Sequence, residues 1–156
     1  MTDDTMSRIA LAAERGRQPG GREEARRALT ELWHETGDGE ALHRCTIAHF
    51  LADVQDDPAA ELAWDERALA ASEAITRAEE TGSGWRVAAL LPSLCASLAD
   101  DHRRLGDPVR AREYLAQAEA AAPALGDDDY GLLVKGIITE IGEALDAGSE
   151  EPLAAD

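Results

Sequence analysis

Three residues with metal-binding or nucleophilic side chains stand one helical turn apart in the first third of the chain. Cys45, His49 and Asp53 occupy positions i, i+4 and i+8, so on an α-helix they share one face. A thiolate, an imidazole and a carboxylate together are able to ligate a transition metal. Cys45 beside His49 could also act as a nucleophile, but no third group or oxyanion donor accompanies them. Alternatively, Cys45 and His49 could simply pack between helices, and this packing role is the one we expect.

Runs of aspartate are the second group of residues that could do chemistry. These runs are Asp56-Asp57, Asp100-Asp101 and Asp127-Asp128-Asp129. Paired carboxylates act as general acids and bases, and they also bind calcium. All three runs lie at or near the ends of expected helices, where carboxylates cap the backbone and complement the helix dipole. The sequence has no calcium-loop spacing, no His-Glu-x-x-His motif and no phosphate loop. We therefore expect no enzyme activity, no cofactor and no bound metal.

The elements that position these residues are expected to be helices. Apolar residues recur every three or four positions between glycine- and proline-rich breaks, and no segment alternates like a strand. Pro58 and Pro108 each follow an aspartate, an arrangement that starts a helix. Seven helices are predicted, over residues 5–16, 22–36, 39–55, 58–80, 85–105, 108–122 and 129–146. Trp33, Trp64 and Trp85 are expected to fill space in or between them.

Small and bulky residues recur at fixed spacing along pairs of these helices. The clearest copy reads Cys95-x2-Leu98-Ala99-x2-His102, followed by Ala111-x3-Leu115-x2-Ala118-x4-Pro123. An earlier copy reads Ile9-x2-Ala12-Ala13-x2-Gly16, followed by Ala25-x3-Leu29-x2-Leu32-x4-Gly37. Partial copies are Cys45-x2-Ala48-His49-x2-Ala52 and Ile138-x2-Ile141-Gly142-x2-Leu145. After the first partial copy, Glu61 and Asp65 stand where apolar residues belong.

This spacing resembles the tetratricopeptide repeat, over residues 6–146. The middle copies lie further apart than the repeat length of about 34 residues, which is similar to long-helix variants in bacterial regulators and in small proteins of high-GC actinobacteria. The resemblance implies an all-α fold, a right-handed stack of antiparallel helix pairs that forms an α-solenoid. We expect a single domain over residues 1–148 and a disordered acidic tail over 149–156. A helical bundle without repeats is the alternative fold.

The resemblance also implies a binding surface, because successive first helices of tetratricopeptide proteins line a concave groove that holds a peptide or a partner helix. Matching positions by register selects His43, Thr46, Phe50, Asp53, Ser93, Ala96, Asp100, Arg103, Thr139 and Glu143. Phe50 is the only phenylalanine, and it is either an exposed anchor or buried by the preceding helix. The implied function is a protein–protein interaction module. The alternative is a self-associating structural or regulatory protein without a separate peptide ligand.

The charge of the chain constrains its partners. The net charge is −17, yet residues 1–30 hold six arginines and five acidic residues, a net of +1. The acidic remainder repels phosphate, so nucleic acid is not expected as a partner. The negative charge of this part either keeps the protein soluble or attracts a basic or amphipathic protein segment. No apolar run reaches the roughly 18 residues that span a membrane, and the acidic start does not read as a signal peptide, so we expect a cytoplasmic protein.

The last expected helix is the most apolar. A stripe through Leu133 or Val134, Ile137, Ile141 and Leu145 is expected to pack on the preceding helix pair, with Leu132 and Ile138 toward its edges. Leaving several of these residues exposed would favour association. A homodimer through this helix, or a partner protein that covers it, would bury these residues. The alternative is that the helix lies deeper in the monomer.

Overall fold

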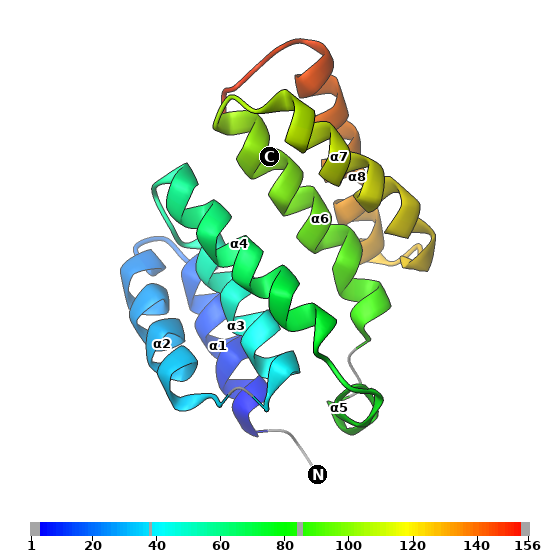
Figure 1. Cartoon of the computed structure of the whole chain (residues 1–156). Coiled ribbons are helices and arrows are strands. Elements are labelled where there is room, and N and C mark those ends of the chain that lie inside the picture. The colour runs from blue at the N-terminus through cyan, green and yellow to red at the C-terminus, as the bar shows by residue number, and fades with distance from the viewer. Residues whose placement is uncertain (1–3, 38, 84–85, 154–156) are drawn as a thin grey trace. The chain divides into compact units, whose positions relative to one another are not determined.

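The computed structural model describes residues 4–37, 39–83 and 86–153 and is built from helices (Figure 1). The helices are α1 (Asp4–Arg17), α2 (Arg22–Glu35), α3 (Ala41–Asp53), α4 (Pro58–Glu73), α5 (Arg77–Ser83), α6 (Val87–Arg104), α7 (Pro108–Ala121) and α8 (Asp129–Asp146). A 3-10 turn, Ala122–Ala124, follows α7. No strand occurs among the described residues, so the prediction of an all-α fold is confirmed.

The single helix predicted over residues 58–80 is wrong, because α4 ends at Glu73 and α5 begins at Arg77. Thr76 starts the new helix. Its hydroxyl accepts a hydrogen bond from the Glu79 backbone N–H at 3.1 Å, and the Glu79 carboxylate accepts one from the Thr76 backbone N–H at 3.4 Å. This reciprocal pair is a capping box, which satisfies N–H groups that a helix start leaves without partners. Trp85, the first residue of the helix predicted over 85–105, lies outside the described residues.

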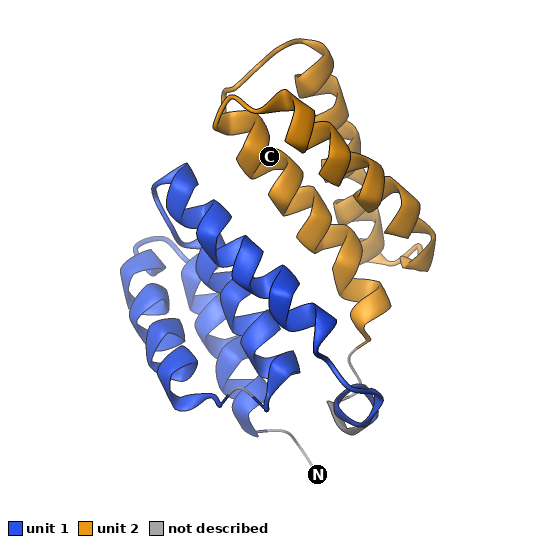
Figure 2. Ribbon diagram, in the orientation of Figure 1, with its two compact units in different colours: residues 1–85 blue, residues 86–156 orange. Residues whose placement is uncertain are grey.

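Packing divides the chain into two compact units, residues 1–85 and 86–156 (Figure 2). Each unit has its own cluster of buried apolar side chains. Because packing defines each unit separately, the expectation of a single domain over residues 1–148 stays a prediction.

In the first unit, α1 packs on α2 and α3, α2 also packs on α3, and α3 makes its most extensive contact with α4. The most deeply buried apolar side chains of its cluster are Ile9, Ala25, Leu29, Ile47 and Leu51. Trp33 of α2 and Trp64 of α4 meet edge to face with ring centroids 5.1 Å apart, and both pack against this cluster. Arg44 stacks on Trp33 and Arg67 on Trp64, at 3.7 and 4.4 Å from the ring centroids. These two tryptophans thus fill space between helices, as predicted.

In the second unit, α6 and α7 form a pair and α8 packs on both. The buried stripe of α8 consists of Val134, Ile138, Ile141 and Leu145. The placement of Ile138 at an edge was wrong, because the spacing of four, three and four residues centres the stripe on Ile138 and Ile141. Leu132 and Leu133 are 56% and 60% exposed.

Glycines with positive φ end α6 and α8. Gly106 and Gly148 have φ values of 82° and 68°. In each case the glycine N–H and the next N–H bond back to carbonyls of the last turn, as in a Schellman motif. The chain then turns back toward its own unit: Leu153 packs against the core, and the Ser149 carbonyl accepts a hydrogen bond from Arg103 at 2.8 Å. Residues 154–156 of the expected tail lie outside the described residues.

Candidate protein-binding surface

Helix α3 carries four of the residues that the sequence selects for a binding surface. Thr46 is buried, and its hydroxyl donates to the Leu42 carbonyl at 2.9 Å, so it does not present its side chain to a partner. His43 lies near Glu40, with 17% of its side chain exposed. Phe50 packs against the first unit's core and is half-buried. Its position is therefore intermediate between an exposed anchor and a fully buried core residue. Asp53, the last residue of α3, is exposed.

Phe50 and Asp53 lie together at a pocket of about 220 Å³. Its lining comes from the end of α1, the start of α2 and the end of α3: Ala13, Gly16, Arg17, Arg22, Phe50, Asp53 and Val54. Gly16 lets these segments meet. A Cβ at this position would lie 3.2 Å from both the Ala25 Cβ and a Val54 methyl group, closer than side chains normally pack. We call this cavity the α3 pocket.

Two arginines of α2 hold the segment at the end of α3, next to this pocket. Arg22 donates to the carbonyl oxygens of Asp53 and Gln55, at 3.1 and 2.9 Å. Arg26 donates to the Val54 carbonyl, at 2.7 Å from its closer nitrogen. Their positive charges stand where the dipole of α3 is negative. We call these two arginines and residues 53–56 the arginine clamp.

The clamp ends on an exposed carboxylate. Both guanidinium groups bond Asp56, at 3.1 and 3.2 Å. These hydrogen bonds, first from Arg22 and then from Arg26, lower the pKa of the Asp56 carboxyl. Asp56 is therefore charged across the neutral range and completes the clamp electrostatically.

The Asp53 carboxyl experiences opposing influences. Burial among neighbouring protein atoms raises its pKa, and the nearby His49 lowers it. Arg17 and Arg22 also lower this pKa, whereas Glu61 raises it. The residue as a whole is nevertheless exposed at the pocket's rim. A cationic group of a partner would stabilise the charged carboxylate further.

The face shared by Cys45, His49 and Asp53 serves packing. Cys45 is 1% exposed, and burial raises the pKa of its thiol to about 12, so the thiol stays protonated at neutral pH. His49 instead turns to α4, where its Nδ1 lies 3.4 Å from the carboxylate of the buried Asp65. That contact explains why an aspartate stands where the sequence pattern favours an apolar residue. Among the described residues, no group of three histidines, cysteines or acids has the geometry of a metal site.

Helix α6 carries a second predicted set, and its polar members hold the second unit together. The Asp100 carboxylate accepts from Arg103 at 2.7 Å and from Arg104 at 3.0 Å. Arg103 is only 2% exposed, and it also donates to the Ser149 carbonyl. Arg104 bonds Asp101, which is buried as well. We call Asp100, Asp101, Arg103 and Arg104 the α6 charge cluster, and burial keeps Arg103 from facing a partner.

The remaining predicted residues differ in exposure. Ala96 is buried in the core of the second unit. Ser93 is half-buried, and its hydrogen bond with Tyr130 partly offsets the burial that raises the pKa of that phenol. Thr139 and Glu143 are exposed on α8, one turn apart. Among the predicted residues of the second unit, these two are the exposed ones.

The aspartate runs behave as caps in two of three cases. Asp57 accepts from the Ala59 N–H at the start of α4, and Asp128 accepts from the Gly131 N–H at the start of α8. Asp107 does the same before α7, so both Asp-Pro pairs start helices as predicted. Asp100 and Asp101 differ, since they lie within α6 and pair with arginines of the next turn. Capping does not explain this third run.

No helix among the described residues is both long enough and apolar enough to cross a membrane. Comparisons with protein-family models, with curated proteins and with solved structures found no match to this chain.

Proposed function

We propose that this chain is a tetratricopeptide-like interaction module that binds a basic or amphipathic segment of another protein over the α3 pocket. One observation carries the proposal. Helices α1 and α3, the first members of two successive pairs, contact each other, and the α3 pocket lies where they meet. In a stack of antiparallel helix pairs, adjacent first helices line the groove.

The second unit supports the same architecture. Helices α6 and α7 pair, and α8 packs on both, as the first helix of a following pair does in such a stack. The apolar residues of the clearest repeat copy fit this role, since Cys95, Ala99, Ala111, Leu115 and Ala118 all belong to the unit's core. A right-handed solenoid of seven or eight helices is the architecture we propose.

Charge defines the chemistry of the partner. The chain after residue 30 has a net charge of −18, so a basic segment is attracted from a distance. At the pocket, Phe50 offers an aromatic surface and Asp53 a carboxylate at the rim. The two arginines of the lining are already paired, Arg17 with Glu14 and Arg22 with Asp56. An amphipathic helix that places an apolar side chain against Phe50 and a lysine or arginine near Asp53 fits both.

The groups with catalytic potential support binding over catalysis. The Cys45 thiol is buried and protonated, and His49 is engaged with Asp65. The acids of the α6 charge cluster are neutralised by arginines of the same helix. Each of these groups has a structural role that accounts for its position.

A displayed library of helical peptides tests the proposed function. We expect selection on the intact protein to enrich basic amphipathic sequences, and their affinity to fall as salt screens the charges. Asp53→Lys should weaken binding about tenfold, whereas Glu66→Lys, the same charge change at an exposed position of α4, should leave it within about twofold. Enrichment of acidic or neutral peptides, or equal effects of the two substitutions, would argue against the proposal.

Self-association through α8 is a second candidate, favoured by a specific observation. Leu132 and Leu133 are both more than half exposed, and Gly136 lies on the next turn between them. A Cβ at Gly136 would meet no described atom within 4 Å, so another backbone has room to approach. Leu133→Asp should then abolish the dimer in light scattering; a wild-type mass near 16.7 kDa at every concentration would exclude this candidate.

A further inference from the structure

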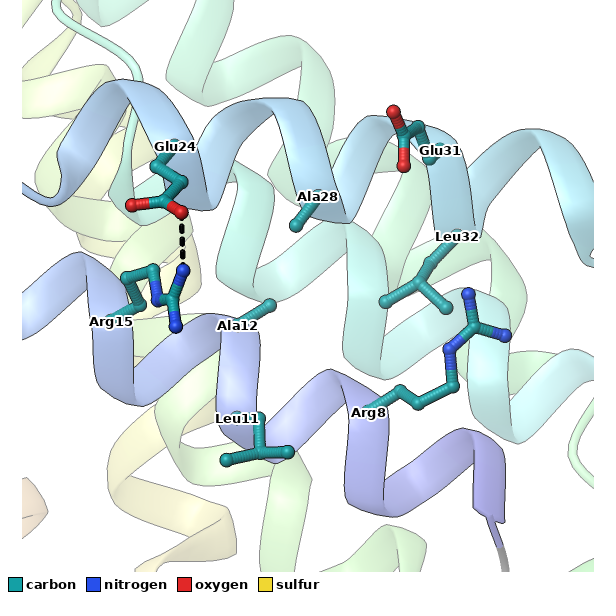
Figure 3. Close-up of a pocket in the computed structure, with 8 residues that line it drawn as sticks. All are labelled: Arg8, Leu11, Ala12, Arg15, Glu24, Ala28, Glu31 and Leu32. Carbon is teal, nitrogen blue, oxygen red and sulfur yellow. Dashed lines mark hydrogen bonds and ion pairs between the residues drawn. The ribbon is translucent and has the colours of Figure 1, made fainter.

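An open groove runs between α1 and α2, on residues that the proposed function does not use (Figure 3). It has a volume of about 290 Å³ and is lined by Arg8, Leu11, Ala12, Arg15, Glu24, Ala28, Glu31 and Leu32. Its floor is apolar and small. Leu11 stands beside it with 72% of its surface exposed, the most exposed large apolar residue in the described part of the chain.

The two walls of the groove have opposite charge. The polar side chains from α1 are Arg8 and Arg15, and those from α2 are Glu24 and Glu31. Arg15 pairs with Glu24 across the groove, and Arg8 pairs with Glu35 at 3.0 Å. These four paired side chains are each 48–58% exposed, so they also face solvent. A basic wall and an acidic wall therefore remain available to a second surface.

The order of charges along the walls is self-complementary. The pairs Arg15–Glu24 and Arg8–Glu35 show that α1 and α2 run in opposite directions, so Glu24 lies level with Arg15 and Glu31 lies toward Arg8 (Figure 3). Rotating a second copy by 180° about an axis along the groove places its α1 over this α2. Arg15 of the second copy then faces Glu24, and Arg8 of the second copy faces Glu31. The reciprocal contacts form by symmetry.

We propose that the α1–α2 groove is a docking surface for a second copy of this chain. The same rotation brings the exposed Leu11 of each copy against α2 of the other. Burial of this side chain adds an apolar centre to the ring of ion pairs.

The distribution of charge favours this part of the molecule for self-contact. Residues 4–35 contain six arginines and six acidic residues and are neutral, whereas the whole chain has a net charge of −17. Two copies that meet through α1 and α2 bring neutral segments together, so repulsion between like charges is small at the contact itself. An acidic or a basic foreign segment would match one wall and be repelled by the other.

The size of the groove sets the strength of the contact. Helices of 14 residues are about 21 Å long, so two such helices form an interface at the small end of specific contacts. We expect association at about 100 μM and a monomer at about 1 μM. Sedimentation velocity of the intact chain over this range measures both states.

Charge exchange between the walls tests the proposal. The variant Arg8→Glu/Arg15→Glu has two acidic walls, and the variant Glu24→Arg/Glu31→Arg has two basic walls. Each alone should remain monomeric at about 100 μM, and an equimolar mixture should associate again, because the acidic walls of one meet the basic walls of the other. A wild-type chain that is monomeric at this concentration, or a mixture that fails to associate, overturns the proposal.

Two single substitutions keep the test decisive if a double variant unfolds. Leu11→Asp should weaken association at least tenfold with unchanged helicity, whereas Val109→Asp, at a residue of α7 that is 69% exposed, should have no effect. Leu133→Asp on α8 should leave association through the groove intact. If Leu133→Asp abolishes association and Leu11→Asp does not, the interface lies on α8 and this proposal is wrong.

Discussion

Both units use arginine to fix a segment that follows a helix, but at different depths. In the first unit, Arg22 and Arg26 donate to the carbonyls of residues 53–55, and the side chain of Arg26 is still 27% exposed. In the second unit, Arg103 donates to the Ser149 carbonyl, and its side chain is 1% exposed. Each segment also packs one apolar side chain, Val54 or Leu153, against the core of its unit. We therefore expect the loss of stability on removing each arginine to increase with the burial of its side chain.

The largest effect is expected at Arg103. Arg103→Ala removes the bonds to Asp100 and Ser149 and leaves partly buried acceptors without their cation, so it should lower the free energy of unfolding by about 3–5 kcal/mol. Arg112→Ala is the matched control, because Arg112 pairs with Asp146 on the surface at 3.3 Å, and should cost about 0–1 kcal/mol. Urea denaturation measures both. Equal losses would contradict a structural role for the buried arginine.

Substitution of Arg26, the more exposed counterpart in the first unit, should lower stability by a smaller amount. Arg26→Ala removes the bonds to Val54 and Asp56 but lets water reach the freed groups, so we expect a loss of about 1.5–3 kcal/mol. Arg27→Ala, at the exposed neighbouring position of α2, should change stability by less than about 0.5 kcal/mol. A loss at Arg26 that exceeds the loss at Arg103 would reverse the comparison between the units.

Alkaline pH should destabilise the first unit through Cys45. The pKa of this thiol is raised from 9.0 to about 12 by burial, so stability is complete below pH 9 and falls as the unfolded thiol ionises above it. At pH 10.5 the loss should reach about 2 kcal/mol relative to pH 8. Cys45→Ala should lose this contribution and keep only the contribution of Cys95, the remaining buried thiol. A parallel pH dependence in both proteins would contradict a buried, protonated Cys45.

The smallest effect is expected at Asp56. Hydrogen bonds from Arg22 and Arg26 lower the pKa of this exposed carboxyl, so its contribution is present above pH 4 and disappears as the pH falls through the lowered pKa. Asp56→Asn should reduce the denaturation midpoint slightly at pH 7 and progressively less as the pH falls below 4. Asp127→Asn, which alters a carboxylate with 96% of its side chain exposed, is the control and should leave the denaturation midpoint at pH 7 unchanged.

The sequence predicts the local features of this fold well, because their signals lie within one helical turn. Asp57-Pro58 and Asp107-Pro108 place two helix starts at the observed residues. The break between α4 and α5 also has a local signal, Thr76-x-x-Glu79, which the apolar periodicity alone does not reveal. The predicted apolar stripe of α8 is offset from the observed one because Leu132, Leu133 and Val134 are all apolar. Composition therefore does not indicate which of the three faces the core.

Contacts between distant residues could not be predicted in the same way. His49 meets Asp65 because α3 docks on α4, and nothing in the spacing of these two residues specifies that contact. Arg103 meets Ser149 across 46 positions, only after the chain turns back at the end of α8. For this reason Thr46 and Arg103 were assigned to a surface although tertiary packing buries them. Phe50 and Asp53 lie at a pocket because α1, α2 and α3 converge at Gly16.

Site-specific cross-linking tests the proposed binding surface most directly. A photoreactive residue would replace Arg17 in one variant and Glu143 in another, so that one exposed probe lies at the α3 pocket and one on α8, and Asp53 is left intact. Each variant would be irradiated with a selected basic amphipathic peptide. The account predicts a cross-link from position 17 that an excess of unmodified peptide prevents. A peptide that cross-links to position 143 but not to 17, or to neither, would contradict binding at the α3 pocket.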